Sequence, residues 1–530
     1  MMNFNPHRLL RPLALMSALV FLMVGILSSF TLAVKAATGD LDPTFGTGGK
    51  IVITAPQGPK ALRAIAIQRD GKVIVAGWGA NPPPQTFTDV ALARYNPDGS
   101  LDQTFGTGGY ILNPFSYDPD EVYAIGIQSN GKIVIGGKTS NSMGKPFWLL
   151  ARYTADGHLD TTFGLNGIIR GPDDSVIYNL AILPDDRIVT VGSAYQFSYL
   201  PSGTYLTRFN ADGGHDSSFN GNGYVLTPYG LFGYPGTALA VQPDGKIIIG
   251  GGSSFTMMRY NTDGSVDMNF GTGGVATASF AKPYAVITAL GLQSDGRIVA
   301  AGYAGDVNGP FDFALTRFKY NGAVDKSFNG GKVTTDFSGE DDAARALIIQ
   351  PDGRPVAVGY ASHQGNYDFA LARYNWDGSL DSTFGSGGKV TTDFAGGNDQ
   401  AYAAALQSDG KIIAAGNASN PFLKGALARY SGDGFDLTLQ DEGNGNILQI
   451  NSATGQYVFK NCAGTVLGGT GTVTRRGAII TLQHNGGDRK VQATVDANTH
   501  RANATIKIIG GGPAYTIIDR DITNNTGTCP

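Results

Sequence analysis

The chain has little glutamate and little charge. Only Glu121, Glu340 and Glu442 are glutamate among its 43 acidic residues, and 15% of its 530 residues are charged. Glutamate is a good helix former, whereas aspartate and the 76 glycines favour turns, so the composition excludes a large helical layer. With 42% apolar residues and this length, we expect a soluble, all-β protein made of several units.

The chain also lacks an excess of basic residues. Its formal net charge is −4, which offers no basic stripe for phosphates, so no nucleic-acid partner is expected. Cysteine is almost absent: Cys462 and Cys529 are the two, and in an oxidising compartment such a pair predicts a disulfide. No cysteine and histidine cluster accompanies them, so neither a metal nor another cofactor is expected.

The first 37 residues form a separate segment. His7, Arg8 and Arg11 precede an uncharged stretch and then small residues suited to a signal peptidase, so residues 1–37 predict a signal peptide. The stretch is also nearly long enough to span a bilayer, which takes about 20 residues, so an uncleaved N-terminal anchor stays open. Either form predicts an exported protein of a bacterium, secreted, periplasmic or at the cell surface, that contacts the membrane only if the segment is uncleaved.

One phrase recurs through residues 38–434. It is "LDQTFGTGGYI" at Leu101, and its copies are spaced by 51 to 60 residues, beginning at Leu41, Leu159, His215, Val266, Val324 and Leu380. Each unit holds four short apolar segments, and Asp-Gly or Asn-Gly between the first two is the strongest short signal of a β-hairpin. The third copy departs, with Asp185-Asp186. Four-stranded units repeated at this spacing predict a β-propeller or a solenoid.

The distribution of strands separates these two folds. The seventh copy lacks its fourth strand after Gly434, whereas "GGKIVIT" at residues 48–54 precedes the first hairpin with no copy of its own. If the early strand completes the last blade, no unpaired edge remains. The sequence therefore predicts a seven-bladed β-propeller of four-stranded blades over residues 38–434, closed by its N-terminal strand.

Three residues of the repeat stand at fixed offsets. We expect the phenylalanine to fill the gap between adjacent sheets, and the arginine and aspartate to form a repeated ion pair at the corner of each blade. The phenylalanines are Phe45, Phe105, Phe163, Phe219, Phe270, Phe328 and Phe384. The arginines are Arg94, Arg152, Arg208, Arg259, Arg317, Arg373 and Arg429, and the aspartates are Asp42, Asp102, Asp160, Asp216, Asp267, Asp325 and Asp381.

Three phrases, "LDxTFGxxGKV", "QxDGKIxxAG" and "ALARYNxDGSLD", recur in fixed order. They resemble the delta-60 repeat, a bacterial β-propeller repeat, over roughly residues 39–434. This resemblance implies a propeller in an exported or surface protein, and it brings no catalytic residues with it. Residues 435–530 lie outside it.

Motifs for metal binding and catalysis are weak. "NPDGSLD" at residues 96–102 is similar to a calcium loop, but Arg94 stands where such loops place their first aspartate, so an Asx turn is expected. The histidines share no metal spacing, and no Gly-x-Ser-x-Gly elbow is present. The adjacent pairs Asp173-Asp174 and Asp341-Asp342 are expected to be solvated, not an acid and base. No catalytic residue and no metal ligand is predicted.

The loops between the second and third strands and between blades share one face, and among the copies they vary most. Loops on a rigid scaffold commonly carry binding, and aromatic side chains supply contact energy, so this variable face is the candidate binding surface. The alternative is that the aromatics only cover the blade ends. The aromatic residues assigned to these loops are Trp78, Phe87, Tyr117, Tyr195, Tyr199, Tyr229, Phe232, Tyr234, Tyr303, Tyr360 and Tyr367.

Residues 435–530 alternate between apolar and polar residues in short segments separated by turns. This pattern predicts a small β-sandwich-like C-terminal domain. For the whole chain we expect an exported, non-enzymatic scaffold that binds a protein or glycan of unknown identity through its variable face. An extracellular hydrolase or lyase that acts on glycans at the same face is the alternative, because propellers host both classes.

Overall fold

The structure is a computed structural model. It describes residues 38–432, apart from 81–86, 117–118, 142–143, 195–201, 229–235, 253, 308, 395 and 420, and beyond them the backbone of separate strands. Among the described residues no helix is long and apolar enough to cross a membrane. The predicted signal segment, residues 1–37, and the predicted disulfide between Cys462 and Cys529 lie outside the described residues.

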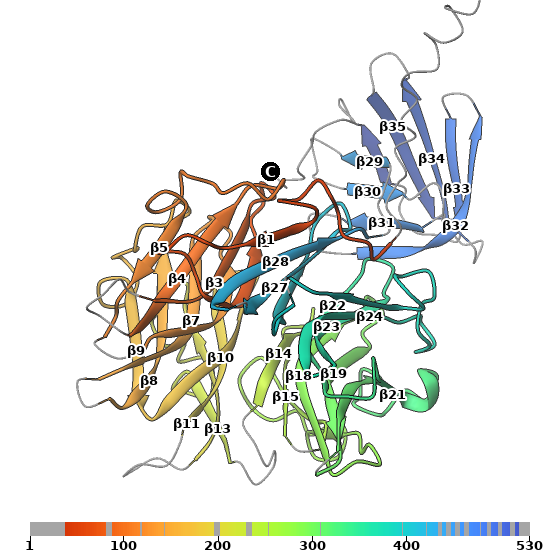
Figure 1. Cartoon of the computed structure of the whole chain (residues 1–530). Coiled ribbons are helices and arrows are strands. Elements are labelled where there is room, and N and C mark those ends of the chain that lie inside the picture. Colours follow the sequence, from red (N-terminus) through yellow and green to blue (C-terminus); the bar gives the residue numbers. More distant parts are fainter. Residues whose placement is uncertain are drawn as a thin grey trace, which may run out of the picture. The chain divides into compact units, whose positions relative to one another are not determined.

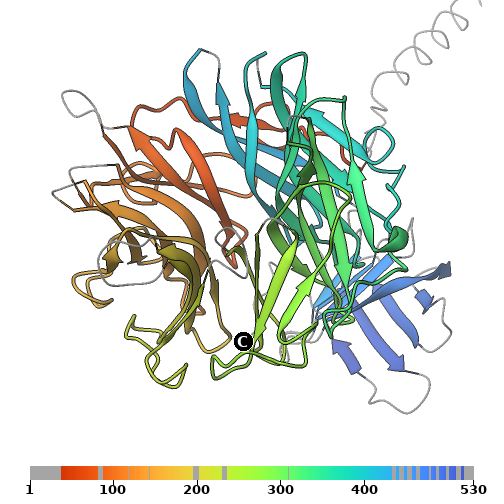
Figure 2. The ribbon, with the colours of Figure 1, turned by 90° about the horizontal axis from the view of Figure 1, so that it is seen from below.

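Seven four-stranded antiparallel sheets follow one another around a ring, as the colours show in Figure 2. The first three blades consist of β2 (Ala61–Ile67), β3 (Val73–Ala80), β4 (Thr88–Tyr95) and β5 (Tyr110–Asn113); β6 (Glu121–Ile127), β7 (Ile133–Ser140), β8 (Pro146–Tyr153) and β9 (Ile168–Asp173); and β10 (Ser175–Ile182), β11 (Ile188–Ala194), β12 (Gly203–Phe209) and β13 (Tyr224–Pro228). This order confirms the predicted all-β propeller.

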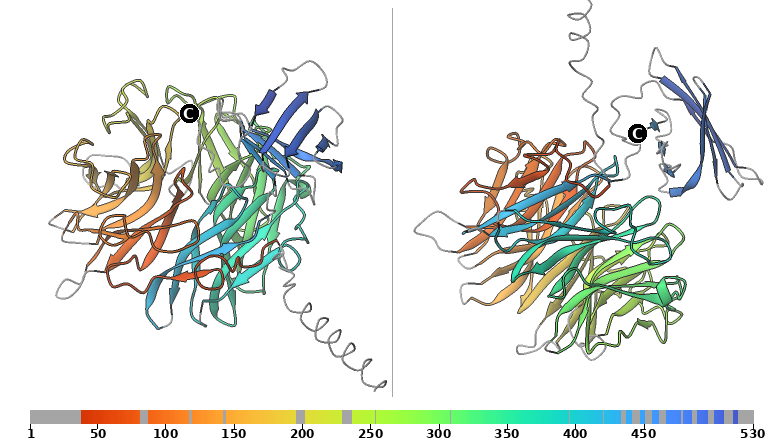
Figure 3. Two further views of the ribbon diagram at one scale, coloured as in Figure 1. Left: turned by 90° about the horizontal axis from the view of Figure 1, so that it is seen from above. Right: turned by 45° about the vertical axis from the view of Figure 1, so that its right-hand side comes forward.

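The next blades repeat the arrangement, and the left view of Figure 3 shows the same circular order from the other side. They consist of β14 (Gly236–Val241), β15 (Ile247–Gly251), β16 (Thr256–Tyr260) and β17 (Val275–Thr277); β18 (Tyr284–Leu292), β19 (Ile298–Gly305), β20 (Phe311–Phe318) and β21 (Lys332–Thr335); and β22 (Asp342–Ile349), β23 (Pro355–His363), β24 (Asn366–Arg373) and β25 (Lys389–Thr392). A short 3-10 turn, Asn329–Gly331, precedes β21.

The seventh blade joins the two ends of the propeller. It contains β26 (Gln400–Leu406), β27 (Ile412–Ser419) and β28 (Leu423–Tyr430), and its fourth strand is β1 (Lys50–Val52). Ile51 pairs with Leu427 in antiparallel register, and Figure 1 shows β1 beside β28. The predicted closure by the N-terminal strand is confirmed.

The core lies between adjacent blades. In the second strand of a blade both faces are buried, which explains the continuous small apolar runs such as "VIVAG" in β3. Val134 and Leu150 of one blade pack with Ile177 of the next in one buried cluster. Such inter-blade contacts stabilise the ring through burial of apolar area, at roughly 25 cal/mol per Å².

The repeated residues take the predicted positions. All seven phenylalanines of the phrase are fully buried, at 0% exposure. Each repeated arginine places its Nε 2.7–2.9 Å from the repeated aspartate, and its guanidinium lies 4.4–4.8 Å from the centroid of a repeated phenylalanine ring. The predicted ion pair therefore exists in every blade, and its arginine also packs against the repeated phenylalanine ring.

The turns of the hairpin face explain two sequence features. Asp98 accepts hydrogen bonds from the backbone and hydroxyl of Ser100 through Oδ1, which confirms the Asx turn in "NPDGSLD". In the deviating third copy, Asp186 adopts φ 65°, the left-handed conformation that glycine takes at this place in the other copies, with φ of 81–88°.

In the C-terminal part, eight described strands follow consecutive antiparallel order. They are β29 (Leu437–Gln440), β30 (Ile447–Ile450), β31 (Gln456–Lys460), β32 (Val466–Arg476), β33 (Ile479–His484), β34 (Arg489–Asp496), β35 (Arg501–Ile508) and β36 (Tyr515–Ile518). The right view of Figure 3 shows several of these strands in blue. The prediction of a β-sandwich-like domain stays a prediction.

Candidate functional site

A one-residue bulge interrupts the first strand of every blade. In β22, for example, Ala344 pairs with Gly359 and Ala346 with Val358, so Arg345 is left without a partner in the ladder. The corresponding bulge residues of the seven blades are Arg63, Tyr123, Tyr178, Thr237, Thr288, Arg345 and Tyr402. We call these residues the bulge ring.

Glycine in the second strand makes room for the bulge. A Cβ added to Gly359 would lie 1.9 Å from the carbonyl oxygen of Ala343, far closer than atoms approach. Corresponding glycines meet the first strand at 1.8–2.0 Å in five other blades, namely Gly77, Gly137, Gly192, Gly302 and Gly416. The repeated "AG" and "GG" of the second strand therefore serve to position the bulge ring.

The bulge ring lines a cavity of about 400 Å³ at the centre of the propeller. All seven of its side chains are half-buried, and the rest of the wall consists mainly of small and aliphatic residues from the first strands. A mostly apolar cavity with a few converging polar groups is the usual form of a ligand site.

Aromatic and cationic side chains contact one another in an arc beside this cavity, and three of them, Arg63, Arg345 and Tyr402, line it. The guanidinium of Arg63 lies 3.6 Å from the centroid of Tyr402, and the rings of Tyr402 and Tyr360 are 6.5 Å apart. Arg345 donates a hydrogen bond of 2.8 Å to the hydroxyl of Tyr360 and lies 5.3 Å from the rings of both Tyr360 and Tyr303. These contacts link blades 1, 7, 6 and 5 into one cation–aromatic arc.

On the opposite wall, Tyr123 and Tyr178 form a tilted pair with centroids 5.8 Å apart. The hydroxyl of Tyr123 donates to the carboxylate of Glu121, which also forms an ion pair of 3.2 Å with Lys138. Burial and the neighbouring Glu121 raise the pKa of Tyr123. The charges beside this wall, on Glu121 and Lys138, therefore balance each other.

Positive charge in the cavity is not compensated by the described wall. Two guanidinium groups line the cavity and no described lining residue is acidic. Neither Arg63 nor Arg345 forms an ion pair within the described part of the chain, and Nη1 of Arg63 and Nε of Arg345 are buried there without a hydrogen-bond partner. An arginine cannot relieve this cost by losing its proton.

Several predicted aromatics lie near this cavity. Trp78, Tyr303 and Tyr360 occupy one corresponding position in β3, β19 and β23, directly after the bulge glycine. Tyr367 in β24 packs against Tyr360 with centroids 5.0 Å apart, and Phe87 is 44% exposed. The assignment of Trp78, Tyr303, Tyr360 and Tyr367 to loops was wrong, because these strands extend further than the sequence pattern indicated.

The remaining predicted aromatics lie outside the described residues. They are Tyr117, Tyr195, Tyr199, Tyr229, Phe232 and Tyr234.

The sequence reasoning missed Arg63, Tyr123, Tyr178, Arg345 and Tyr402. A signal was present, because one position in the first strand is large or polar and varies among copies whose neighbours stay small and apolar. It appears in "LRAIAI", "VYAIGI", "IYNLAI", "ARALII" and "AYAAAL".

Two groups of aspartates are the described residues that could hold a metal ion. In one, Asp312, Asp336 and Asp342 bring ligand atoms within 4.8 Å of one another, and Asp368, Asp393 and Asp399 do the same one blade further on. Three carboxylates supply only part of the six to eight oxygens that calcium takes. The expectation of no metal stays untested by this geometry.

Asp342 also corrects a prediction. Expected to be solvated, it is fully buried, at 0% exposure. Its Oδ2 accepts a hydrogen bond from the backbone N–H of Phe337, whereas Oδ1 has no hydrogen-bond partner in the described part of the chain. Burial, together with the charges of Asp336 and Asp312, raises its pKa to about 7.

At the closing seam, lysines replace two of the corresponding aspartates. By strand register, Lys424 stands where Asp368 stands in the preceding blade, and Lys60 stands where Asp399 stands. Burial and the neighbouring Lys424 lower the pKa of Lys60. The acidic group is therefore a property of particular seams and not of the repeat.

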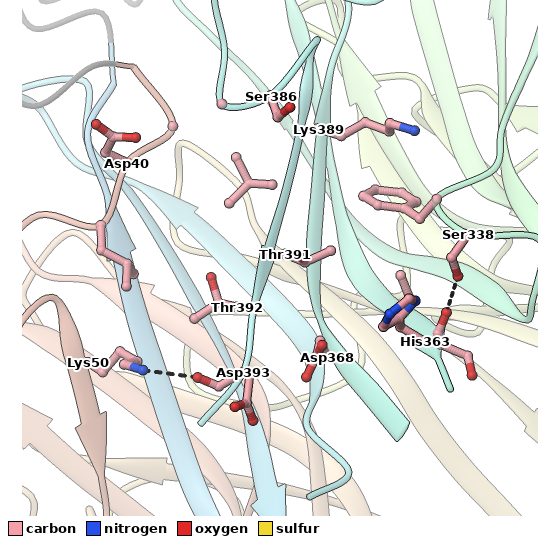
Figure 4. A pocket seen from close by; sticks show the side chains of 17 residues that line it. Asp40, Lys50, Ser338, His363, Asp368, Ser386, Lys389, Thr391, Thr392 and Asp393 are labelled. Carbon is pink, nitrogen blue, oxygen red and sulfur yellow. Dashed lines mark hydrogen bonds between the residues drawn. The ribbon is translucent and has the colours of Figure 1, made fainter. Parts of the chain in front are cut away.

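A groove of about 1010 Å³ runs along the outermost strand of the sixth blade, β25. Figure 4 shows its lining, with Asp368 and Asp393 at one end and His363 nearby. Lys50 of the closing strand donates a hydrogen bond of 2.9 Å to the carbonyl oxygen of Asp393. The groove lies along one blade, whereas the central cavity is lined by residues of all seven blades.

The closed ring of repeats defines the class of this protein as a β-propeller with sequence repeats. Six segments match the family described as "Domain of unknown function (DUF5122) beta-propeller", at residues 68–105, 128–163, 242–270, 293–328, 350–384 and 407–435. No segment of the third copy, which carries the Asp185-Asp186 turn, is among these matches.

Solved structures of similar fold include a protein of unknown function from Bacteroides caccae, 13% identical, covering 60% of this chain and 98% of that one at a TM-score of 0.35. A protein of unknown function from Dyadobacter fermentans is 12% identical, covering 72% and 98%, also at 0.35. The polysaccharide lyase Uly1 is 12% identical, covering 76% and 94%, at 0.39. Among curated proteins, none matches the chain.

Proposed function

We propose that this protein is an exported, non-enzymatic binding scaffold that takes its ligand at the mouth of the central cavity, on the variable face. Its N-terminal segment acts as a signal peptide or an anchor, its cysteines form a disulfide, and its repeats are of the delta-60 type.

The observation that carries the proposal is the cation–aromatic arc. Arg63, Tyr402, Tyr360, Arg345 and Tyr303 come from four blades and contact one another in a chain. Arg63, Arg345 and Tyr402 of this arc line the central cavity. Clusters of tyrosine and arginine in partly desolvated pockets are typical of binding hot spots. A purely structural role would not require polar groups to face a cavity.

The test is a binding array of glycans and proteins with the purified chain. Tyr402→Ala removes the ring at the centre of the arc and should abolish capture of the ligand. Phe422→Ala is the matched control, because Phe422 lies between β27 and β28 on the same face and is 75% exposed. Equal loss in both variants, or no ligand in the array, would contradict the proposal.

A glycan lyase is the second candidate. The hydrogen bond from Arg345 to the hydroxyl of Tyr360 favours it, because a phenolate stabilised by a fixed cation can remove the proton from the carbon next to a carboxylate and so start an elimination. A hydrolase is less favoured, since it commonly needs two carboxyl groups and the described cavity wall has none. Release of an unsaturated product from an acidic polysaccharide would establish the lyase.

A further inference from the structure

The positive charge of the central cavity calls for a partner of opposite charge. Taking a charged group out of water costs several kcal/mol unless it is paired, and each of the seven repeated arginines meets this need with an aspartate at 2.7–2.9 Å. Arg63 and Arg345 differ, because neither has an acidic partner within the described chain. Other contacts in the structure offset this free-energy cost, and the two unpaired charges make the cavity a site that attracts anions.

Unpaired donors add to the cost of these two charges. Arg345 uses one Nη to bond Tyr360, and its Nε, like Nη1 of Arg63, is buried with no acceptor among the described residues. Because these two atoms are buried, an anion in the cavity would bond the other nitrogen atoms of the two guanidinium groups that line it. An oxyanion with two or more oxygens is the acceptor that guanidinium groups hold best, because it can receive parallel hydrogen bonds.

Aromatic rings define the rest of the ligand. Tyr402 and Tyr360 stand beside the two guanidinium groups, and Tyr123 and Tyr178 cover the wall across the cavity. A volume of about 400 Å³ admits one or two rings of a small ligand. Thr237 and Thr288 of the bulge ring add short hydroxyl groups to the same wall.

We propose that the central cavity binds the charged end of an acidic saccharide, with its oxyanion held by Arg63 and Arg345 and a sugar ring against the tyrosines. This inference rests on the proposed binding function and names the chemical class of its ligand. A uronate carboxylate and a sulfate ester share this oxyanion chemistry.

The experiment measures the affinity of the full chain for three matched probes by titration calorimetry. They are an oligogalacturonide, a sulfated oligogalactoside and the neutral oligogalactoside of the same length. At least one acidic probe should bind ten-fold or more tightly than the neutral one. Its affinity should fall as salt is raised, because the ionic contacts are screened. The probe that binds identifies which oxyanion is recognised.

Variants tie the binding to the two arginines. Arg63→Gln and Arg345→Gln should each lower the affinity for the acidic probe at least ten-fold while thermal melting still shows a folded chain, and Arg345→Lys should restore part of it. Arg170→Gln is the control, because Arg170 is exposed and donates to the carbonyl of Phe115.

The outcomes distinguish a failure of this inference from a failure of the proposed binding function. Binding of the neutral probe as tight as that of the acidic ones, abolished by Tyr402→Ala but not by Arg345→Gln, would overturn the inference and leave the binding scaffold standing. Absence of binding by every acidic probe, together with capture of a protein at the variable face, would likewise overturn only the inference. If nothing in the array bound, both the inference and the proposed binding function would be contradicted.

Discussion

Arg429 and Asp42 form an ion pair of 2.9 Å that joins the last copy of the repeat to the start of the propeller. The same guanidinium donates to the carbonyl of Pro97 in the first blade and lies over the ring of Phe45. The pair is the seventh member of a repeated set, and it is the one whose partners stand at opposite ends of the propeller sequence. Closure of the ring therefore uses the same contact that fixes every other corner.

Removal of Asp42 should loosen the closure. Asp42→Asn leaves Arg429, which is 3% exposed, without its carboxylate, and breaking a buried pair in this way costs about 3–5 kcal/mol. We expect a lower free energy of unfolding by chemical denaturation and faster hydrogen exchange in β1. Asp267→Asn breaks the matching pair within one blade and should lower stability without affecting β1. Equal exchange in β1 for both variants would contradict the role in closure.

Truncation of a repeated phenylalanine between the blades should lower stability as much as truncation of any buried core aromatic residue. Phe163 is fully buried, and Arg152 lies 4.6 Å from its ring, so Phe163→Ala leaves a cavity and is expected to cost about 3–5 kcal/mol. The measurement is the free energy of unfolding from urea titration. Phe422→Ala, at a side chain that is 75% exposed, should stay within about 0.5 kcal/mol. A melting temperature of Phe163→Ala within a degree of the parent would be inconsistent with a structural plug.

Much of the fold could be predicted because seven copies repeat the same information. The strand left over before the first hairpin and the strand missing after the last are visible in the sequence, and β1 pairs with β28 as they require. The buried phenylalanine and the ion pair could also be predicted, since a residue repeated at a fixed offset must have a repeated environment.

The candidate site could not be predicted in the same way. Arg345 faces the cavity because a bulge shifts the register by one residue between Ala344 and Ala346, and the apolar pattern of a single strand does not show where a bulge falls. Asp312, Asp336 and Asp342 come from β20, from the end of β21 and from the start of β22, so only packing between blades brings them together. Trp78, Tyr303 and Tyr360 were predicted to lie in loops, whereas β3, β19 and β23 extend through them.

The glycine opposite the bulge should be essential to the site. Gly359→Ala puts a Cβ against the carbonyl of Ala343, so the bulge must flatten or the strands must separate. We expect a loss of about 2 kcal/mol or more in stability, in the range of overpacked cores, and a loss of binding at Arg345. Gly214→Ala is the control, since the nearest atom to its added Cβ is a flexible carboxylate at 3.4 Å. A Gly359→Ala protein with unchanged stability would show that the glycine has no such role.

Stability should fall as pH rises from about 5 to 7. The pKa of Asp342 is raised to about 7 and that of Asp399 to about 6, in each case by burial first and by neighbouring aspartates as well. Both folded pKa values lie above the unfolded value near 3.9, so the folded chain holds these protons more tightly and their contribution is present at low pH and lost as pH rises. The pKa of Asp42 stays at about 2, because hydrogen bonds from Thr44 and the charge of Arg429 outweigh its burial, so the repeated ion pairs remain charged throughout this range.

The measurement is the urea midpoint at several pH values with a chelator present, so that proton binding alone is followed. One proton contributes at most about 1.4 kcal/mol per pH unit, and we expect a decline approaching that slope between pH 5 and pH 7. Asp342→Asn keeps an acceptor for the N–H of Phe337 and removes the charge, so it should flatten the decline and be more stable than the parent at pH 8. Asp70→Asn, at a carboxylate that is 55% exposed, should leave the profile unchanged. A parent stability that is constant or rises over this range would show that Asp342 is ionised in the folded chain.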